Sequence, residues 1–285
     1  MISGTRARLN AEIARQSRLA QEIARGQADI SSTKRLQAPS DDPAASARVA
    51  DIRRTQANQL VWSANIEAAS TMAAQVDDTL EGVGTAFDRA RELMLAASNG
   101  ALNDSDRAAI ATELRGIADD IVSFAAGKDS RGYPLFPATD ALLIPIGPGV
   151  RVAATASHAD IFEGVQTTAG PMDLEQIVRA AADAVEIADK AARTTATAGA
   201  LAAVEAGADH IAAERGAQGV RAARIDSVRE RLAASGLLLE EERGGLEGTD
   251  LTATIARINA LQLSLEAAQA TFARLNRSTL FDKLV

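Results

Sequence analysis

The residues that could do chemistry are few in this chain, and their spacing builds no metal or cofactor site. The two histidines, His158 and His210, lie far apart in the sequence, and the chain contains no cysteine. A metal site needs three or four converging ligands, and an isolated histidine supplies only one of them. Gly147-Pro148-Gly149 lacks the lysine that follows the glycines of a phosphate-binding loop. We therefore expect no bound metal and no cofactor.

Three acidic doublets have the composition of paired catalytic carboxylates: Asp41-Asp42, Asp77-Asp78 and Asp119-Asp120. Consecutive side chains on a helix point in different directions, so the two carboxylates of a doublet do not face each other across a substrate. Helix capping explains the first doublet better, and solvated helix faces explain the other two. Because no nucleophile accompanies a base and an acid, we do not expect an enzyme.

The composition favours long, closely packed helices over a β-sandwich. Of 285 residues, 47% are apolar but only 3% are aromatic. No apolar run approaches the roughly 20 residues of a membrane span. The segment from Met1 to Asn10 has no apolar signal-peptide core, so any export is expected to proceed without a cleaved signal peptide.

The charge is distributed unevenly along the chain. Residues 1–35 carry a net charge of +4 and residues 251–285 carry +2, whereas the whole chain carries −8. Basic ends on an acidic body could bind nucleic acid or a membrane. However, the basic residues fit the polar faces of amphipathic helices, and no aromatic side chains alternate with them to stack on bases. We expect no nucleic-acid partner and no membrane span.

Prolines are confined to positions 39–43 and 134–171, which leaves three segments free to form long helices. The first segment predicts a helix over 3–34. The next predicts a helix that begins at Pro43 and carries an unbroken seam with steps of three and four residues. The members of this seam are Ile66, Ala69, Ala73, Val76, Leu80, Val83, Phe87, Ala90 and Met94. A third helix follows an Asn103 cap, and its seam is Ile110, Leu114, Ile117, Ile121 and Phe124.

Residues 131–170 change character, because glycine and proline separate short apolar runs. This pattern predicts two or three short strands with tight turns. Helical patterning returns at Asp173, with one helix predicted to about residue 192 and a longer one over 201–243. Gly244-Gly245 is expected to end the longer helix.

Both ends of the chain carry apolar stripes at helical spacing, and such stripes are unstable until they meet another apolar surface. We predict that they form an assembly interface and that they stay mobile in the free subunit. The predicted interface residues are Leu9, Ile13, Ile23, Ile30, Leu251, Ile255, Ile258, Leu265, Phe272 and Leu275.

These elements predict a mainly α fold: a long antiparallel coiled-coil bundle formed by the N- and C-terminal segments, with a small β-rich insert in the middle. We expect five parts. They are an N-terminal helix and linker (1–42) that pairs with the C-terminal helix (246–285), two parts of a helical bundle (43–130 and 171–245), and the insert (131–170).

Several motifs, in order along the chain, resemble those of the flagellin superfamily. Pro39-Ser40-Asp41-Asp42-Pro43 is similar to its N-terminal signature, and a block with Arg89, Arg91, Glu92 and Leu93 resembles the next conserved stretch. Gly216-Ala217-Gln218-Gly219-Val220-Arg221 resembles a C-terminal block, and Leu246 to Leu251 resembles the acidic linker before the last helix. The ending Ser278-Thr279-Leu280-Phe281-Asp282 is similar to that of the hook-associated protein 3 branch. One departure is Pro137-Ala138, where this branch has a glycine pair.

The resemblance implies a structural subunit of the bacterial flagellum at the hook–filament junction. It implies export by the flagellar type III apparatus to the extracellular flagellum. The implied partners are other copies of the chain, hook-associated protein 1, flagellin and an export chaperone. Three alternatives remain. A short filament flagellin has the same motifs, a chemoreceptor-like signalling rod would explain the heptads but not the insert, and a host-binding surface protein would need exposed aromatic residues on the insert.

Overall fold

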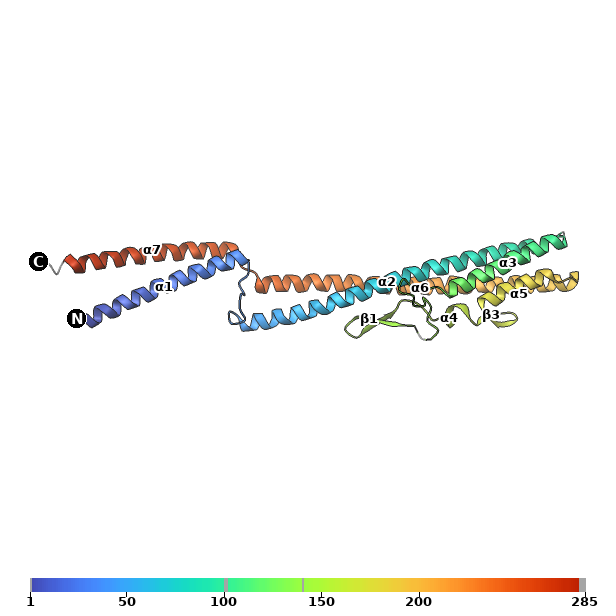
Figure 1. Cartoon of the computed structure of the whole chain (residues 1–285), viewed down its shortest axis with the longest axis horizontal. Helices are drawn as coiled ribbons and strands as arrows, with labels where there is room; N and C mark the ends of the chain where they lie inside the picture. The colour runs from blue at the N-terminus through green and yellow to red at the C-terminus, as the bar shows by residue number, and fades with distance from the viewer. Residues whose placement is uncertain (1, 100–101, 140, 282–285) are drawn as a thin grey trace. The chain divides into compact units, whose positions relative to one another are not determined.

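The computed structural model describes residues 2–99, 102–139 and 141–281 of the chain (Figure 1). The elements are α1 (Ile2–Ser32), α2 (Pro43–Ala97), α3 (Asp104–Ala125), β1 (Leu143–Gly147), β2 (Val150–Ala153), α4 (His158–Phe162), β3 (Val165–Thr167), β4 (Gly170–Met172), α5 (Leu174–Glu186), α6 (Lys190–Glu247) and α7 (Leu251–Phe281). The fold is mainly α with a small β-rich insert, as the sequence predicts. Among the described helices, none has the length and apolarity that a bilayer span requires.

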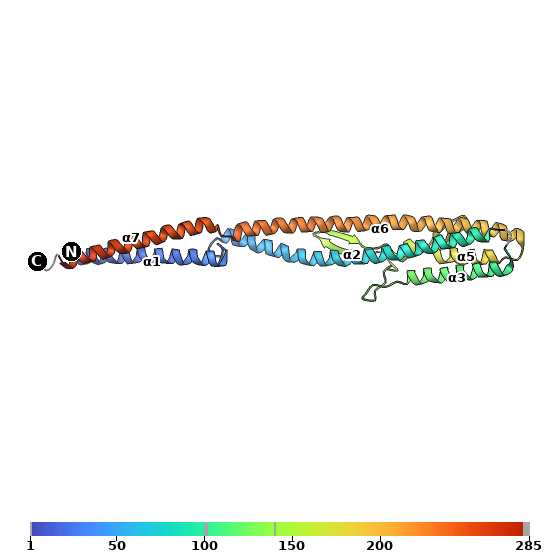
Figure 2. The same ribbon diagram turned by 90° about the horizontal axis from the view of Figure 1, so that it is seen from above.

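The chain forms two compact units, and both α2 and α6 contribute to each of them. One unit contains residues 1–57 and 235–285, and the other contains residues 58–234. In the first unit, α1 packs antiparallel against α7, with the beginning of α1 and the end of α7 at the same end of the pair (Figures 1 and 2). Ile23 of α1 and Ile258 of α7 are each 8% exposed between the two helices.

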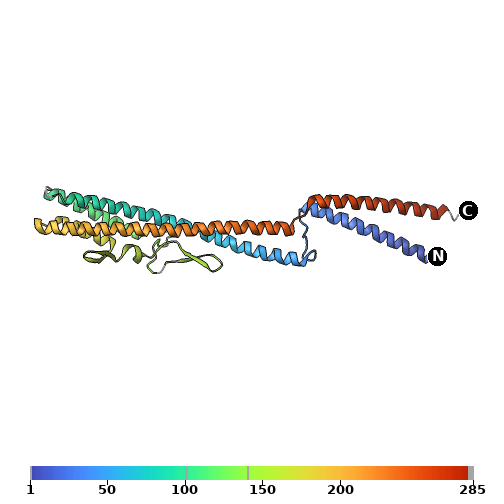
Figure 3. The ribbon, with the colours of Figure 1, turned by 180° about the vertical axis from the view of Figure 1, so that it is seen from behind.

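The second unit is a bundle of α2, α3, α5 and α6, in which α3 and α5 lie side by side (Figures 2 and 3). The seam predicted for α2 is buried along its whole length, and its part from Val76 to Met94 meets α3, α5 and α6 in the main core. In the seam predicted for α3, Leu114, Ile117 and Ile121 are buried, whereas Ile110 and Phe124 are half-buried. The core contains Val76, Leu80, Val83, Phe87, Met94, Leu114, Ile117, Ile121, Leu174, Ile177, Val178, Val185, Val204 and Ile211. The seam that the sequence singled out on α2 is therefore the main apolar face of this unit.

The predicted boundaries of α5 and α6 were wrong. The α5 helix ends at Glu186 and α6 already begins at Lys190. The turn between them is stabilised by Arg193, whose Nη1 donates to the carbonyl oxygens of Ile187 and Ala188, and by Asp189, which caps the amide of Ala192 at 2.7 Å. At its other end, α6 continues through both glycines at 244–245 to Glu247, because these glycines adopt helical geometry rather than a left-handed cap.

The insert consists of two β-hairpins separated by the short helix α4, rather than the two or three strands predicted. The strands β1 and β2 pair antiparallel with a register shift between Pro145 and Gly147, and β3 pairs with β4. Ile146 and Val152 of the first hairpin are buried against α2 and α6. The hairpin thus covers one side of the bundle where α3 and α5 are absent.

Candidate functional site

The histidines do not form a site together. His158 Nδ1 lies 3.0 Å from Glu163 Oε1, and His210 Nε2 lies 3.0 Å from the carbonyl oxygen of Ile161. The first contact lies within the α4 segment, whereas the second joins α6 to α4. In the described parts of the chain, no three His, Cys, Asp or Glu side chains gather as metal ligands would. The candidate functional site is therefore taken from the family-type motifs and the apolar surfaces of the described residues.

The linker between α1 and α2 is built around the two aspartates of the first doublet. Asp41 Oδ2 accepts hydrogen bonds from the amides of Gln37 and Ala38, at 3.1 and 3.0 Å, and its Oδ1 lies 2.5 Å from Arg25 Nη2. The amide of Ala38, followed by Arg25, lowers the pKa of Asp41. Asp42 Oδ1 caps α2 by accepting from the amide of Ala45 at 3.0 Å. The two carboxylates thus stabilise the turn of the chain between two helices.

Pro39, Ser40 and Pro43 complete this linker without contributing charged groups. Pro43 is the first residue of α2, where its fixed φ suits the helix and its missing N–H costs no hydrogen bond. Pro39 and Ser40 lie in the turn that brings Asp41 back toward the amide of Ala38. The motif is therefore a compact reversal of the chain.

The Arg89 motif joins α2 to α3. Arg89 Nε donates to Glu113 Oε1 at 2.7 Å, and its Nη1 donates to Glu92 Oε2 at 3.0 Å. These carboxylates, Glu113 first, raise the pKa of Arg89. Arg91 pairs with Asp88 on the helix surface, and Leu93 is buried in the core. The motif thus presents charges on its outer side and an apolar anchor on its inner side.

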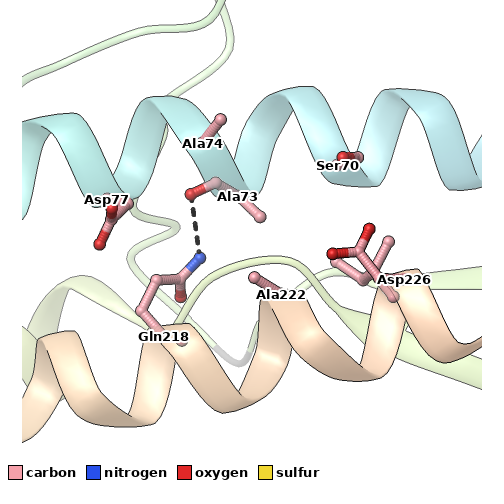
Figure 4. A pocket seen from close by; sticks show the side chains of 9 residues that line it. Ser70, Ala73, Ala74, Asp77, Gln218, Ala222 and Asp226 are labelled. Carbon is pink, nitrogen blue, oxygen red and sulfur yellow. Dashed lines mark hydrogen bonds between the residues drawn. The ribbon is translucent and has the colours of Figure 1, made fainter.

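Gly216 and Gly219 do not serve close packing within the chain, because a Cβ atom built on either glycine would meet no atom within 4 Å. Of the two residues between them, Gln218 makes the contacts that join distant segments. Gln218 is 1% exposed, and its Nε2 donates to the carbonyl oxygens of Ala73 in α2 and Ala154 beyond β2, at 3.2 and 2.8 Å. Figure 4 shows its amide directed at Ala73. This side chain therefore fastens the insert to two helices.

The hollows of the described surface include one between α2 and α6 and one beside α1. One, of about 200 Å³, is lined by small side chains of α2 and α6, with Asp77 and Asp226 at its edge (Figure 4). The other, of about 450 Å³, lies between α1, the linker and the beginning of α7. Its cations are matched by anions: Arg25 pairs with Asp41, and Arg257 pairs with Glu22. These two cations of the second hollow are therefore already paired within the chain.

The predicted interface residues fall into two groups. Within the chain, Ile23 and Ile258 are buried, and Ile30, Leu265 and Phe272 are half-buried. By contrast, the exposed fractions are 36% for Leu9, 53% for Ile13, 43% for Leu251 and 47% for Ile255. The side chain of Leu275 lies outside the described residues. The structure thus brings one group together as the seam of α1 and α7 and leaves the other group on the surface.

The structure gives three further residues distinctive surroundings that the sequence does not predict. Leu263 is 69% exposed on α7 and lies off the predicted stripe. In the sequence, Gln218 is only one residue of the block from Gly216 to Arg221. Nothing in the sequence around Gly207 indicates a close contact. In the structure, a Cβ atom at this position would overlap the ring of Phe87. A leucine that falls outside the spacing of the stripe is a sequence signal for Leu263, but only the structure reveals the roles of the other two.

Models of known protein families match most of this chain, including the motifs described above. The model of the bacterial flagellin N-terminal helical region matches residues 6–136, and that of the bacterial flagellin C-terminal helical region matches residues 201–282. The chain belongs to the flagellin superfamily. The two matched regions contain all the motif residues described above, and they leave out most of the insert.

Two relatives in this superfamily are flagellar hook-associated protein 3 of Salmonella typhimurium, 34% identical, and that of Escherichia coli, 33% identical, each over 107 residues. The alignments cover 38% of this chain and 34% of each relative, so the chain matches about a third of the length of these curated relatives.

Solved structures of flagellin-superfamily proteins share the fold. A putative flagellar hook-associated protein from Vibrio parahaemolyticus aligns with a TM-score of 0.66 at 20% identity, covering 73% of this chain and all of that one. The flagellar junction protein FlgL from Legionella pneumophila aligns with a TM-score of 0.59 at 13% identity, covering 70% of this chain and all of that one. The helical bundle with a small insert is therefore a known arrangement.

Proposed function

We propose that this chain is a structural subunit of the bacterial flagellum at the junction between hook and filament. Support comes from the relatives that are named flagellar hook-associated protein 3, together with the superfamily motifs. The observation that carries the proposal is the outer surface of the α1–α7 pair. Three large apolar side chains are exposed on this surface: Ile13 (53%), Ile255 (47%) and Leu263 (69%). Contact of such side chains with water is unfavourable.

The exposed side chains provide an assembly surface in this proposal. The inner seam holds α1 and α7 together within one subunit, and the outer residues gain burial only when another axial subunit covers them. Each fully buried large apolar side chain contributes roughly 1.5–3 kcal/mol, so a few such residues per subunit suffice for cooperative assembly. The proposed partners are further copies of this chain, hook-associated protein 1 and flagellin.

The proposal also includes the route to the flagellum. We infer export of the unfolded chain by the flagellar type III apparatus, with a chaperone that covers the terminal helices before export. The five parts proposed from the sequence then have separate tasks. The terminal parts, 1–42 and 246–285, would contact other subunits. The bundle would consist of 43–130 and 171–245, and the insert, 131–170, would pack on the side of this bundle.

Deletion of the gene followed by electron microscopy tests the function. We expect intact hooks without filaments, filament protein shed into the medium, and restoration of filaments by a plasmid copy. Cells that lose the chain yet keep normal filaments would overturn the proposal. If purified filaments instead contain this chain as their main subunit, it is a filament flagellin.

A further inference from the structure

The two connectors of the chain meet within the first unit, where α1 leads into α2 and α6 leads into α7. Lys34 and Gly248 form an isolated antiparallel bridge. The amide of Arg35 donates to the carbonyl oxygen of Glu247 at 2.7 Å, and the amide of Thr249 donates to that of Thr33 at 3.1 Å. So short a ladder has little stability of its own.

One carboxylate lies at this crossing. Glu247 is only 8% exposed, although a buried charge is unfavourable unless it is paired. Its Oε1 lies 2.5 Å from Arg53 Nη2 of α2, and its Oε2 lies 3.6 Å from Lys34 Nζ of the first connector. A single side chain at the end of α6 therefore holds the linker and the neighbouring helix.

The closed crossing also contains two unfavourable features. Thr33 has φ of 56°, the only positive φ of a non-glycine residue in the described ranges, and left-handed geometry is strained for a β-branched side chain. The hydroxyl of Thr249 is buried and has no hydrogen-bond partner there. Opening the crossing would relieve both, so something must oppose the opening.

We propose that Glu247 is an electrostatic latch that holds the crossing of residues 33–35 and 247–249 closed against this strain, and that loss or screening of its charge opens the crossing. The latch is suited to opening because its cations are accessible: the side chains of Arg53 and Lys34 are 58% and 51% exposed, and salt screens such pairs. The terminal helices α1 and α7 adjoin this crossing, so the latch controls how the two helices are aligned with each other. Its role in assembly rests on the proposed function.

Hydrogen–deuterium exchange on the full-length monomer tests the latch. In the wild type, the amides of Arg35 and Thr249 should exchange slowly at about 0.02 M salt and about tenfold faster at about 1 M salt. In Glu247→Gln, exchange should be fast at both salt concentrations. Glu240→Gln is the matched control, because Glu240 lies on the same helix, is 68% exposed and has only a 3.9 Å contact with Arg243.

Two further variants keep the test decisive. Arg53→Gln removes a partner that is mostly exposed, and it should reproduce fast exchange even if Glu247→Gln fails to fold. The full charge reversal, Glu247→Arg with Arg53→Glu and Lys34→Glu, changes both partners and should restore slow exchange and its salt dependence. Wild-type protection of both amides in Glu247→Gln, or fast exchange in the full charge reversal, would overturn the latch. Since the monomer alone is measured, these outcomes are independent of whether the deletion strain loses its filaments.

Discussion

At the scale of single residues, small side chains decide how closely the helices approach. Gly207 of α6 faces the fully buried ring of Phe87 on α2, and there is no room for a methyl group between them. Gly199 on the same helix faces open space. The same residue type therefore has opposite effects on stability at two positions eight residues apart.

Gly207→Ala should destabilise the protein by about 1–3 kcal/mol, because the overlap with Phe87 outweighs the gain in helix propensity. Gly199→Ala should stabilise it by about 0.5–1 kcal/mol, because only the propensity changes. Urea denaturation of both variants checks the pair. Equal effects of the two substitutions would show that the ring of Phe87 yields without cost.

The α4 cap gives a residue-scale prediction about pH. The hydroxyl of Ser157 donates to Asp160 Oδ2 at 2.6 Å, and this bond, followed by that from the amide of Ser157, lowers the pKa of Asp160. A lowered pKa in the folded state gives stability that is present above the ordinary value of 3.8 and is lost as pH falls through the folded pKa. Ser157→Ala should cost about 1 kcal/mol at neutral pH and less in acid. Thermal melts from neutral pH to about pH 2 check this, and a constant difference would contradict it.

At the scale of elements, the pair of α1 and α7 depends on a close contact. A Cβ atom on Gly26 would lie 2.8 Å from Ile258 Cγ1, a distance that real Cβ contacts do not show. The two stripes can therefore approach at this point only because α1 has no side chain there. The pair belongs to the first unit and can loosen while the core of the second unit stays packed.

Gly26→Val should separate α1 from α7 and leave the bundle of residues 58–234 folded. Limited proteolysis should then release the terminal helices faster than in the wild type, while a fragment containing the bundle persists. Gly244→Ala is the control. Gly244 is also helical, but it has open space around it, so the added methyl group should not disturb the packing. Unchanged proteolysis of Gly26→Val would show that Ile258 moves aside.

At the scale of the whole molecule, the outer and inner residues of α7 should separate assembly from folding. Leu265 is half-buried on the side that faces α1, so this member of the predicted assembly interface is already partly covered within the subunit. Leu263 is 69% exposed on the opposite side. Two leucines that are two residues apart therefore have different surroundings.

Leu263→Asp should leave the melting temperature of the monomer unchanged and abolish motility, because its apolar surface is needed only in the assembly. Leu265→Asp should loosen the α1–α7 pair in the monomer, because a charge there faces an apolar seam. Calorimetry and a motility assay in the complemented deletion strain check both. Normal swimming with Leu263→Asp would exclude this face from assembly.

The sequence by itself determined the positions of the long helices. Seams with steps of three and four residues, such as Ile66 to Met94, and caps such as Asp42 and Asn103 are local patterns that a helix must satisfy wherever it packs. The same local information located the insert through its prolines and glycines. It did not locate the junction of α5 and α6. The sequence there is rich in alanine, which favours helix at every position, so the pattern does not mark where one helix ends and the next begins.

Only the tertiary structure decided what each surface does. Gln218 looks like a defect in an apolar stripe until Ala73 and Ala154, far away in the sequence, bring their carbonyl oxygens to its amide. Likewise, Ile258 and Ile255 are equivalent members of one stripe in the sequence, yet the first is buried against α1 and the second is exposed. Hydrophobic periodicity indicates that an apolar helix face must be buried. Which residues of that face are buried within the chain depends on where distant segments lie in the folded structure.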